Sequence, residues 1–333
     1  MNKINLAIVG ATGLVGSKFL EVLEERNIEI NNLYLYASER SENKVIRFRG
    51  KDYKVIKLNA ENILDKEIDY ALFSAGEKVS REFAPIFNKI NAVVIDNSSA
   101  FRMSDNIPLI VPEVNAYKIS RSDKIISNPN CSTIQCMPPL KVVDNLFKLR
   151  RVDYTTFQAV SGSGMKGIKD LENNLNGKQN EFYPHPILNN CLPHIGDFLD
   201  NSYTKEEIKM VKESQKILDL PTLQINATCV RVPVKNSHSV EMDIECLYPV
   251  DIDRLTKELS NFSGIKLIDN PKNNEYPLAT DASGKDEILV GRIRLDLFDR
   301  RKLHIFCVAD NIRKGAATNA IQILEHCILN INK

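Results

Sequence analysis

A glycine-rich turn near the amino terminus constrains the fold of this chain more strongly than any other feature. The apolar run Ile4–Val9 ends at this turn, and apolar residues then recur at helical spacing. The turn itself reads Gly10-Ala11-Thr12-Gly13-Leu14-Val15-Gly16. A buried strand, a glycine turn and a helix in this order are typical of the start of a doubly wound parallel sheet.

The same turn predicts a nucleotide site. Glycine lets the backbone bend sharply and approach a phosphate, and the following helix presents free N–H groups and the positive end of its dipole. A purely structural turn is the alternative, but the position between a strand and a helix favours a dinucleotide. The expected cofactor contacts are Gly10, Thr12, Gly13, Leu14, Val15 and Gly16.

Further apolar runs extend the alternation of strands and helices along the amino-terminal part of the chain. Strands are expected at Leu33–Ala37, Tyr70–Ser74 and Val93–Asp96, and a helix at Val79–Ile90. This alternation indicates an α/β domain built on a doubly wound, Rossmann-type parallel sheet.

The carboxyl-terminal part has longer strand patterns with fewer helices between them. The expected strands are Val152–Val160, Ala227–Val234, Ser239–Tyr248, Gly291–Phe298 and Leu303–Ala309. They favour a second, α+β domain with a mixed or antiparallel sheet. A helix with one apolar face is expected at Ala316–Ile331, and the polar segment Asn173–Pro186 is expected to be a surface excursion.

Composition excludes several functional classes. The 333 residues are enough for two domains, and 44 basic against 43 acidic side chains give no general attraction to nucleic acid or anionic membrane. Seven cysteines without a CxxC pair, and histidines without ligand spacing, predict neither a disulfide framework nor a metal site. No apolar run approaches a membrane span or a signal peptide, so a cytoplasmic protein is expected.

The choice between NADP and NAD depends on the end of the second strand. An acidic residue there is typical of NAD sites and a basic one of NADP sites. Ser38, Arg40 and Ser41 suit a 2′-phosphate, whereas Glu39 could bind a ribose hydroxyl instead. NADP is the favoured cofactor.

One cysteine lies in unusual surroundings. Cys131 is enclosed by Asn, Pro and Ser residues where a loop enters a helix, in SNPNCST. A helix N-terminus stabilises a thiolate, which makes such a cysteine nucleophilic. For the other six cysteines we expect the usual fate of a free cysteine, a small buried residue. These are Cys136, Cys191, Cys229, Cys246, Cys307 and Cys327.

The sequence resembles the bacterial aspartate-semialdehyde dehydrogenases along essentially its whole length. The matching segments, in chain order, are GATGLVG, DNSSAFRM, VPEVN, SNPNCST, QAVSGSG, EEIKMV, RVPVKNSHS and DNIRKGAATNA. The resemblance implies an NADPH-dependent enzyme that reduces 4-phospho-L-aspartate to L-aspartate 4-semialdehyde through a cysteine thioester. Such an enzyme serves lysine, methionine and threonine biosynthesis.

The resemblance also implies roles for individual residues. Cys131 would be the nucleophile, His238 the general acid and base, and Gln158 would orient the reacting carbonyl. Arg102 and Lys209 would bind the substrate phosphate, Arg231 its carboxylate and Glu206 its ammonium group, with Glu207 as a competing choice for the last role. Ser161, Gly162 and Asn311 would join the cofactor contacts. Glu77 and Asn43 depart from the family pattern near the cofactor, where glycine is usual.

Domain roles and partners follow from the same resemblance. Residues 1–128 with a carboxyl-terminal helix, 311–333, would form the NADP-binding domain, and residues 129–310 the catalytic and dimerisation domain. The partners would be small-molecule substrates, inorganic phosphate and a second copy of the chain.

Two other functions remain open. An N-acetyl-glutamyl-phosphate reductase is one alternative, but an acetylated amine would need no carboxylate at Glu206. A catalytically silent nucleotide-binding paralogue is the other, and the joint presence of Cys131, Gln158, Arg231 and His238 argues against it.

Overall fold

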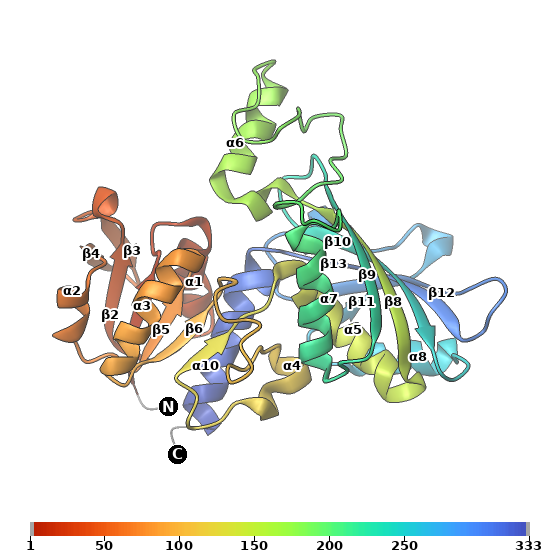
Figure 1. Ribbon diagram of the computed structural model, residues 1–333, viewed down its shortest axis with the longest axis horizontal. Helices are drawn as coiled ribbons and strands as arrows, with labels where there is room; N and C mark the ends of the chain where they lie inside the picture. The colour runs from red at the N-terminus through yellow and green to blue at the C-terminus, as the bar shows by residue number, and fades with distance from the viewer. Residues whose placement is uncertain (1–2, 331–333) are drawn as a thin grey trace. The chain divides into compact units, whose positions relative to one another are not determined.

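A computed structural model of the protein describes residues 3–330. Its contacts divide the chain into two compact units (Figure 1). One consists of Met1–Pro129 with Ala316–Lys333, and the other of Asn130–Gly315.

The first unit is built on a seven-stranded sheet with strand order β3-β4-β2-β1-β5-β6-β7. Its strands are β1 (Ile4–Val9), β2 (Ile30–Ala37), β3 (Val45–Phe48), β4 (Lys51–Lys57), β5 (Tyr70–Phe73), β6 (Val93–Asp96) and β7 (Ile125–Ser127). All neighbouring strands are parallel except the β3–β4 pair. The predicted doubly wound sheet is confirmed, although the sequence patterns missed β3, β4 and β7.

Helices pack on both faces of this sheet. They are α1 (Leu14–Glu25), α2 (Ala60–Leu64), α3 (Glu77–Lys89), α4 (Pro112–Asn115) and α10 (Asn319–Asn330), with short 3-10 turns η1 (Glu39–Ser41) and η2 (Ala116–Lys118). Ile8 of β1 packs in a core with Phe19 of α1 and Leu324 of α10. The adjacent Val9 belongs to the core of the opposite face, with Phe87 of α3. Burial on both faces explains why β1 is apolar throughout.

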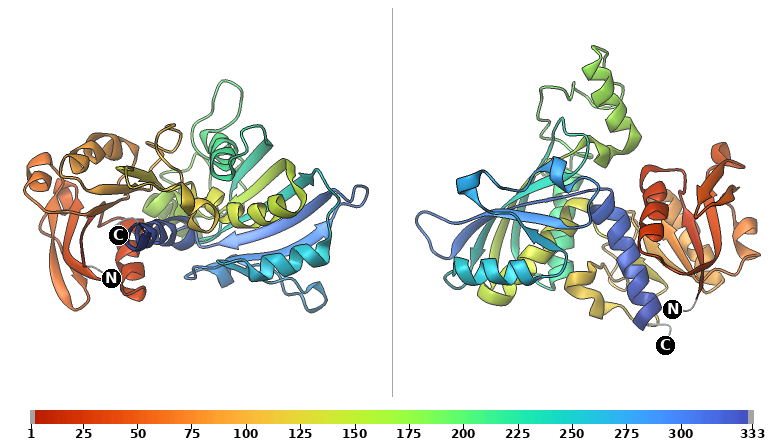
Figure 2. Two further views of the ribbon diagram at one scale, coloured as in Figure 1. Left: turned by 90° about the horizontal axis from the view of Figure 1, so that it is seen from below. Right: turned by 180° about the vertical axis from the view of Figure 1, so that it is seen from behind.

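The chain returns to the first unit through its last helix. A π-helical turn, η5 (Arg313–Thr318), leads into α10, which lies beside α1 (Figure 2, right). The expected helix Ala316–Ile331 therefore exists, but α-helical geometry begins only at Asn319. Ile331 lies outside the described residues.

The second unit contains a six-stranded mixed sheet with strand order β11-β12-β13-β10-β8-β9. The strands are β8 (Leu149–Gln158), β9 (Gln224–Arg231), β10 (His238–Cys246), β11 (Ile265–Leu267), β12 (Ile288–Leu295) and β13 (Lys302–Ala309). The helices are α5 (Cys131–Phe147), α6 (Gly164–Leu175), α7 (Lys205–Leu218), α8 (Ile252–Asn261) and α9 (Ala279–Ala282), with 3-10 turns η3 (Val160–Ser163) and η4 (Pro271–Asn273). The pairs β8–β9 and β11–β12 are parallel, and the other pairs are antiparallel.

Helix α5 packs against the centre of this sheet, on strands β8, β10 and β13, and α7 packs on β9 and on α5. Along β10 the side chains alternate between buried and half-buried, because one face of the strand meets α5. Helix α6 and the loop after it stand out from the sheet (Figure 1). Residues 176–204 carry no helix or strand, which agrees with a surface excursion, although its expected start at Asn173 belongs to α6.

Two strand predictions extend three residues past the observed end of the strand. The pattern Ala227–Val234 was expected to be a strand, whereas β9 ends at Arg231. The pattern Gly291–Phe298 was expected to be a strand, whereas β12 ends at Leu295. The Asp296 carboxylate accepts hydrogen bonds from the backbone N–H groups of Phe298 and Asp299, which turns the chain. Leu297 and Phe298 are consequently 89% and 94% exposed at the tip of the β12–β13 connection.

Two negative findings apply to residues 3–330. None of the helices in this range combines the length and apolarity required to cross a membrane. Within the same range, no group of three or more His, Cys, Asp or Glu side chains is arranged to hold a metal ion.

Candidate active site

The glycine turn forms a close-packed cradle at the end of β1. Gly10 has φ 88°, and a Cβ atom there would lie 2.6 Å from the carbonyl oxygen of Ser74. A Cβ atom on Gly16 would lie 2.1 Å from the Gly10 oxygen. No side chain caps α1 at Gly13, so polar side chains do not occupy the N–H groups at this helix end. The residues present therefore fit a dinucleotide pyrophosphate.

The expected 2′-phosphate ligands lie at the end of β2. Ser38 precedes the 3-10 turn η1, Arg40 is exposed within it, and the buried Ser41 hydroxyl is 3.4 Å from that of Thr12 in the glycine turn. Glu39 instead forms an ion pair with Lys57 at 2.6 Å. A carboxylate already neutralised by lysine is a weaker candidate for a ribose hydroxyl, which favours the phosphate interpretation.

The two departures from the family pattern have local explanations. Asn43 has φ 63°, a conformation that asparagine adopts more readily than most non-glycine residues. Glu77 begins α3, where its carboxylate bonds Arg81 within the helix and the hydroxyl of Ser99. An acidic residue in the first helical turn is favourable for the helix dipole.

Cys131 is the first residue of α5, the helix at the centre of the second unit. The Asn130 side chain caps this helix by accepting hydrogen bonds from the N–H groups of Ser132 and Thr133, at 2.9 and 3.3 Å. Gly315 packs directly on the cysteine, since a Cβ atom on Gly315 would lie 2.9 Å from that of Cys131. The prediction of a cysteine at a helix N-terminus is confirmed. The sequence alone does not indicate these roles of Asn130 and Gly315.

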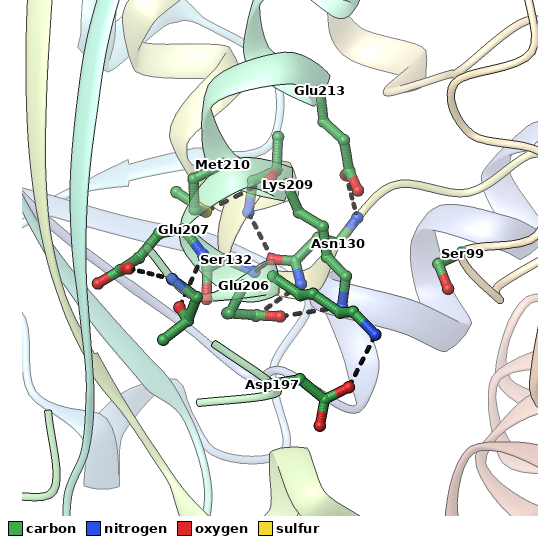
Figure 3. Close-up of polar contacts among 12 residues, drawn as sticks. Ser99, Asn130, Ser132, Asp197, Glu206, Glu207, Lys209, Met210 and Glu213 are labelled. Atoms are coloured by element: carbon green, nitrogen blue, oxygen red, sulfur yellow. Dashed lines mark hydrogen bonds and ion pairs between the residues drawn. The ribbon is translucent and has the colours of Figure 1, made fainter. Parts of the chain in front are cut away.

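A buried polar network surrounds this helix end (Figure 3). The Asn130 amide donates to the Glu206 carboxylate at 2.7 Å, and the other Glu206 oxygen accepts from Lys209 at 3.1 Å. Gln158, the last residue of β8, donates to Glu206 at 3.3 Å. Burial raises the pKa of Glu206, but Lys209, Asn130 and Arg231 outweigh burial and lower it to about 2. Glu206 is therefore ionised at neutral pH although it is buried.

Glu213 lies two helical turns along α7 from Glu206 and binds the backbone of Asn130, the residue before Cys131. Its carboxylate accepts the N–H of Asn130 at 2.6 Å, and its side chain is buried. Sequence patterns gave no signal for this role, because a glutamate on an amphipathic helix is usually solvated.

The adjacent Glu207 has a different function. Its carboxylate accepts the N–H of Thr204 at 2.7 Å while the Thr204 hydroxyl accepts the N–H of Glu207, which makes a capping box for α7. The other Glu207 oxygen accepts the N–H of Cys229 on β9. Both oxygens of Glu207 thus accept hydrogen bonds from backbone N–H groups.

His238 and Arg231 lie together against a glycine. A Cβ atom on Gly162 would lie 2.8 Å from the guanidinium of Arg231 and 3.0 Å from Nε2 of His238. Arg231 ends β9 and donates to the carbonyl of Ala159 at 2.6 Å. Burial lowers the pKa of His238, and nearby Arg231 lowers it further against an opposing effect of Glu206, to about 3. The histidine is neutral at physiological pH.

The hydrogen bonds of His238 fix its tautomer. Nδ1 accepts the backbone N–H of Ala159 at 3.0 Å, so the proton of the neutral ring is on Nε2. Nε2 is buried and has no protein partner within residues 3–330. Gln135, one turn after Cys131 on α5, donates to the carbonyl of His238 at 3.2 Å. This bond connects the cysteine helix to the start of β10.

The remaining predicted residues are placed as follows. Arg102, in the first unit, is buried and donates to the carbonyl groups of Asn128 and Asn97 at 2.9 and 2.7 Å. Ser161 and Asn311 are buried and hydrogen-bonded to each other at 3.0 Å in the second unit. Arg102, Ser161 and Asn311 therefore each make hydrogen bonds to other groups of the protein.

The other cysteines divide into two groups. Five are buried as expected, and burial raises the pKa of Cys246 and Cys327 to about 12. Cys191 is exposed, so the expectation of burial was wrong there. It lies in the surface excursion next to Leu192, which takes the buried position by pairing with the backbone of Arg231.

The fold and the site together define a class of protein. It is a two-unit dehydrogenase in which a Rossmann-type unit precedes a mixed-sheet unit, and the second unit has a cysteine at a helix N-terminus. Family profiles agree with this class. Residues 5–122 match "Semialdehyde dehydrogenase, NAD binding domain", and residues 140–314 match "Semialdehyde dehydrogenase, dimerisation domain". The expected nicotinamide dinucleotide cofactor class is thereby confirmed.

Similarity to individual relatives identifies the family within this class. The chain is 50% identical over 329 residues to aspartate-semialdehyde dehydrogenase of Aquifex aeolicus, covering 96% of each chain. It superposes on aspartate semialdehyde dehydrogenase II of Vibrio cholerae, solved in complex with ASA, with a TM-score of 0.93, 43% identity and 99% coverage of each chain. The chain therefore belongs to the aspartate-semialdehyde dehydrogenase family.

Proposed function

We propose that this enzyme reduces 4-phospho-L-aspartate to L-aspartate 4-semialdehyde, reversibly and with NADPH. The observation that carries the proposal is the capped helix end at Cys131, where Asn130 joins the cysteine to the ionised Glu206. This arrangement supplies a nucleophile next to a carboxylate that can receive the substrate ammonium group. The product is a precursor of lysine, methionine and threonine.

Cys131 acts as the nucleophile. The N-terminus of α5 stabilises its thiolate, which attacks the acyl carbon of the acyl phosphate and expels phosphate. The thioester is reduced to a tetrahedral thiohemiacetal anion, which collapses to the aldehyde and regenerates the thiolate. The one proton consumed overall ends on the released phosphate. When bound, NADPH supplies the hydride.

His238 acts as a hydrogen-bond donor through Nε2. Since Nδ1 is occupied by the Ala159 N–H, the neutral ring can donate from Nε2 but cannot accept a proton there. Donation toward the oxygen of a tetrahedral intermediate stabilises its negative charge. We therefore propose hydrogen-bond donation in place of the acid and base role that the family resemblance implies, and the lowered pKa of His238 supports a ring that stays neutral.

Four charged side chains bind the charged groups of the substrate. Glu206 receives the ammonium group, Arg231 the carboxylate, and Lys209 the phosphate together with Arg102. Gln158 orients the carbonyl through its amide. Glu206 is preferred over Glu207 because both oxygens of Glu207 are already bonded to backbone N–H groups.

The cofactor is NADPH, bound by the unit that contains the glycine turn. Gly10, Thr12, Gly13, Leu14, Val15 and Gly16 hold the pyrophosphate, and Ser38, Arg40 and Ser41 hold the 2′-phosphate. Ser161, Gly162 and Asn311 were predicted to complete the site. Of these, Gly162 also has a steric role, because any side chain there would displace Arg231 or His238.

The enzyme is a homodimer joined through the second unit. The face of the six-stranded sheet opposite α5 carries Phe157 and Phe306, whose ring centroids are 6.4 Å apart, and a Glu241–His304 pair at 2.9 Å. A half-buried sheet face with aromatic and hydrogen-bonded polar side chains suits an isologous interface. No disulfide bond joins cysteines within residues 3–330, which fits a cytoplasmic enzyme.

One assay tests the reaction and its nearest alternative. With NADP and inorganic phosphate, the enzyme should oxidise L-aspartate 4-semialdehyde and show no phosphate-independent turnover. Preference for N-acetyl-glutamate semialdehyde would instead identify the related acyl-phosphate reductase. Absence of turnover with both substrates would indicate a silent paralogue.

A further inference from the structure

The residue before His238 has an unusual backbone conformation. Ser237 has φ 75°, in the left-handed region, and its side chain is 1% exposed. Residues other than glycine rarely adopt this conformation, and they keep it only where neighbouring groups hold them. Something must therefore fix Ser237, and with it the start of β10.

Asn311 supplies this restraint. Its Oδ1 accepts the N–H of Ser237 at 2.9 Å, and its Nδ2 donates to the hydroxyl of Ser161 at 3.0 Å. The β10–β13 ladder ends with the pair His238 and Ala309, so Asn311 continues the connection by its side chain where backbone pairing stops. Asn311 is 2% exposed.

Asn236 and Asp310 form a second link between the residues before β10 and those after β13. Asn236 donates to the Asp310 carboxylate at 2.7 Å, and the Ser161 hydroxyl donates to Oδ1 of Asn236 at 3.1 Å. Asp310 is held in turn by the N–H of Gly284 at 2.7 Å. Residues 236 and 237 are thus each tied to one residue of the segment that follows β13.

The segment that follows β8 restrains the imidazole of His238 as well. Ala159 binds Nδ1 of His238, and Ser161, two residues further along that segment, binds Asn311. Together the two ties fix the ring and its backbone, and hence the direction of the Nε2–H bond. Arg231 and Glu206 are the charged groups that act on this ring.

We propose that Asn311 is a positioning residue that, through Ser237, aims Nε2 of His238 at the reacting oxygen. The proposal rests on the donor role of His238 stated above. It gives Asn311 a part in the chemical step, whereas the family resemblance predicted a cofactor contact.

The test compares turnover with cofactor binding in Asn311→Ala. A donor displaced by about 1 Å loses much of its effect, so kcat at saturating NADP should fall about 10- to 100-fold. The dissociation constant of NADPH, measured by its fluorescence, should stay within about twofold of the wild-type value. Asn311→Asp, which retains an oxygen for the Ser237 N–H, should recover part of the lost kcat.

Controls separate this effect from general damage. Asn174→Ala also removes an asparagine that accepts backbone N–H groups, those of Ile187 and Leu188, but outside the site, and should keep full kcat. If Asn311→Ala does not fold, Ser161→Ala removes the far end of the same link and should lower kcat in the same direction. A raised NADPH dissociation constant with unchanged kcat would overturn the proposal. His238→Ala with wild-type kcat would instead refute the donor role on which it rests.

Discussion

The side-chain amide of Asn130 donates a hydrogen bond to the carboxylate of Glu206 over 2.7 Å, while its oxygen caps the helix that begins at Cys131. One side chain therefore connects the proposed nucleophile to the proposed ammonium site. The negative charge of Glu206 is kept by Lys209 and Arg231 in spite of burial.

Glu206 and Glu207 should differ sharply when each is changed to glutamine. Loss of a charged contact to the substrate ammonium should raise the Michaelis constant for aspartate semialdehyde about 10- to 100-fold in Glu206→Gln. Glu207→Gln should instead lower stability by about 1 kcal/mol, because it weakens the capping box. Steady-state kinetics and thermal unfolding of both variants measure this. Equal kinetic effects in the two variants would argue against the assignment.

Cys131→Ala should abolish turnover and leave NADPH binding nearly unchanged, because the thiolate forms the covalent intermediate. Alkylation should also inactivate the enzyme. Since Cys191 is exposed, it will react as well, and the Cys191→Ser variant is the proper background for peptide mapping of the modified site. That variant should keep wild-type activity. Substantial turnover in purified Cys131→Ala would exclude this residue as the nucleophile.

Arg40→Ala should weaken NADPH binding by about 1.5–3 kcal/mol, through loss of a charge-assisted contact to the 2′-phosphate. NADH binding should hardly change, because NADH lacks that phosphate. Fluorescence titration with both cofactors measures the difference. A matched control is Arg301→Ala, which removes an exposed arginine paired with Asp299 in the second unit and should leave both affinities unchanged. Equal weakening of both cofactors would show that Arg40 supports the loop without contacting the phosphate.

Arg102 and Arg231 should affect different substrates of the reverse reaction. Arg102→Leu should raise the Michaelis constant for inorganic phosphate more than that for the semialdehyde, and Arg231→Leu should do the opposite. Arg231→Lys should rescue poorly, since an ammonium group cannot reproduce the planar fork of a guanidinium. Bisubstrate kinetics separate the two constants. Impairment of both constants in the same proportion would contradict the assignment of the two arginines to different substrates.

His238 should make folding stability depend on pH. Its pKa is about 3 in the folded protein and about 6.5 in an unfolded chain, so below pH ~6.5 the unfolded state binds a proton that the folded state does not. Stability from this group is therefore present above pH ~6.5 and is lost as pH falls toward 3, by up to about 1.4 kcal/mol per pH unit.

His238→Gln cannot titrate and should lack this dependence. The unfolding temperature of wild type minus that of the variant should consequently decrease between pH 7.5 and pH 4.5. A difference that stays constant across this range would mean that the folded pKa of His238 is near its unperturbed value.

Local sequence determined a large part of this protein. The apolar run of β1 and the glycines after it required a buried strand and a tight turn, because only glycine tolerates the φ and the close approach at Gly10. Period-two and helical patterns located most strands and, among the helices, α1, α3 and α10. The Asn-Cys-Ser-Thr run likewise determined the helix start at Cys131, since capping is a local interaction.

Tertiary structure decided what depends on partners distant in the chain. Local sequence marks Glu207 as the capping-box partner of Thr204, whereas the role of Glu206 depends on Asn130, 76 residues away in the chain. The tautomer of His238 depends on the Ala159 N–H, 79 residues away. The sequence patterns also did not predict short edge strands such as β3 or the exposure of Cys191. Periodicity records which face is buried, whereas hydrogen bonds and electrostatics depend on which groups folding brings together.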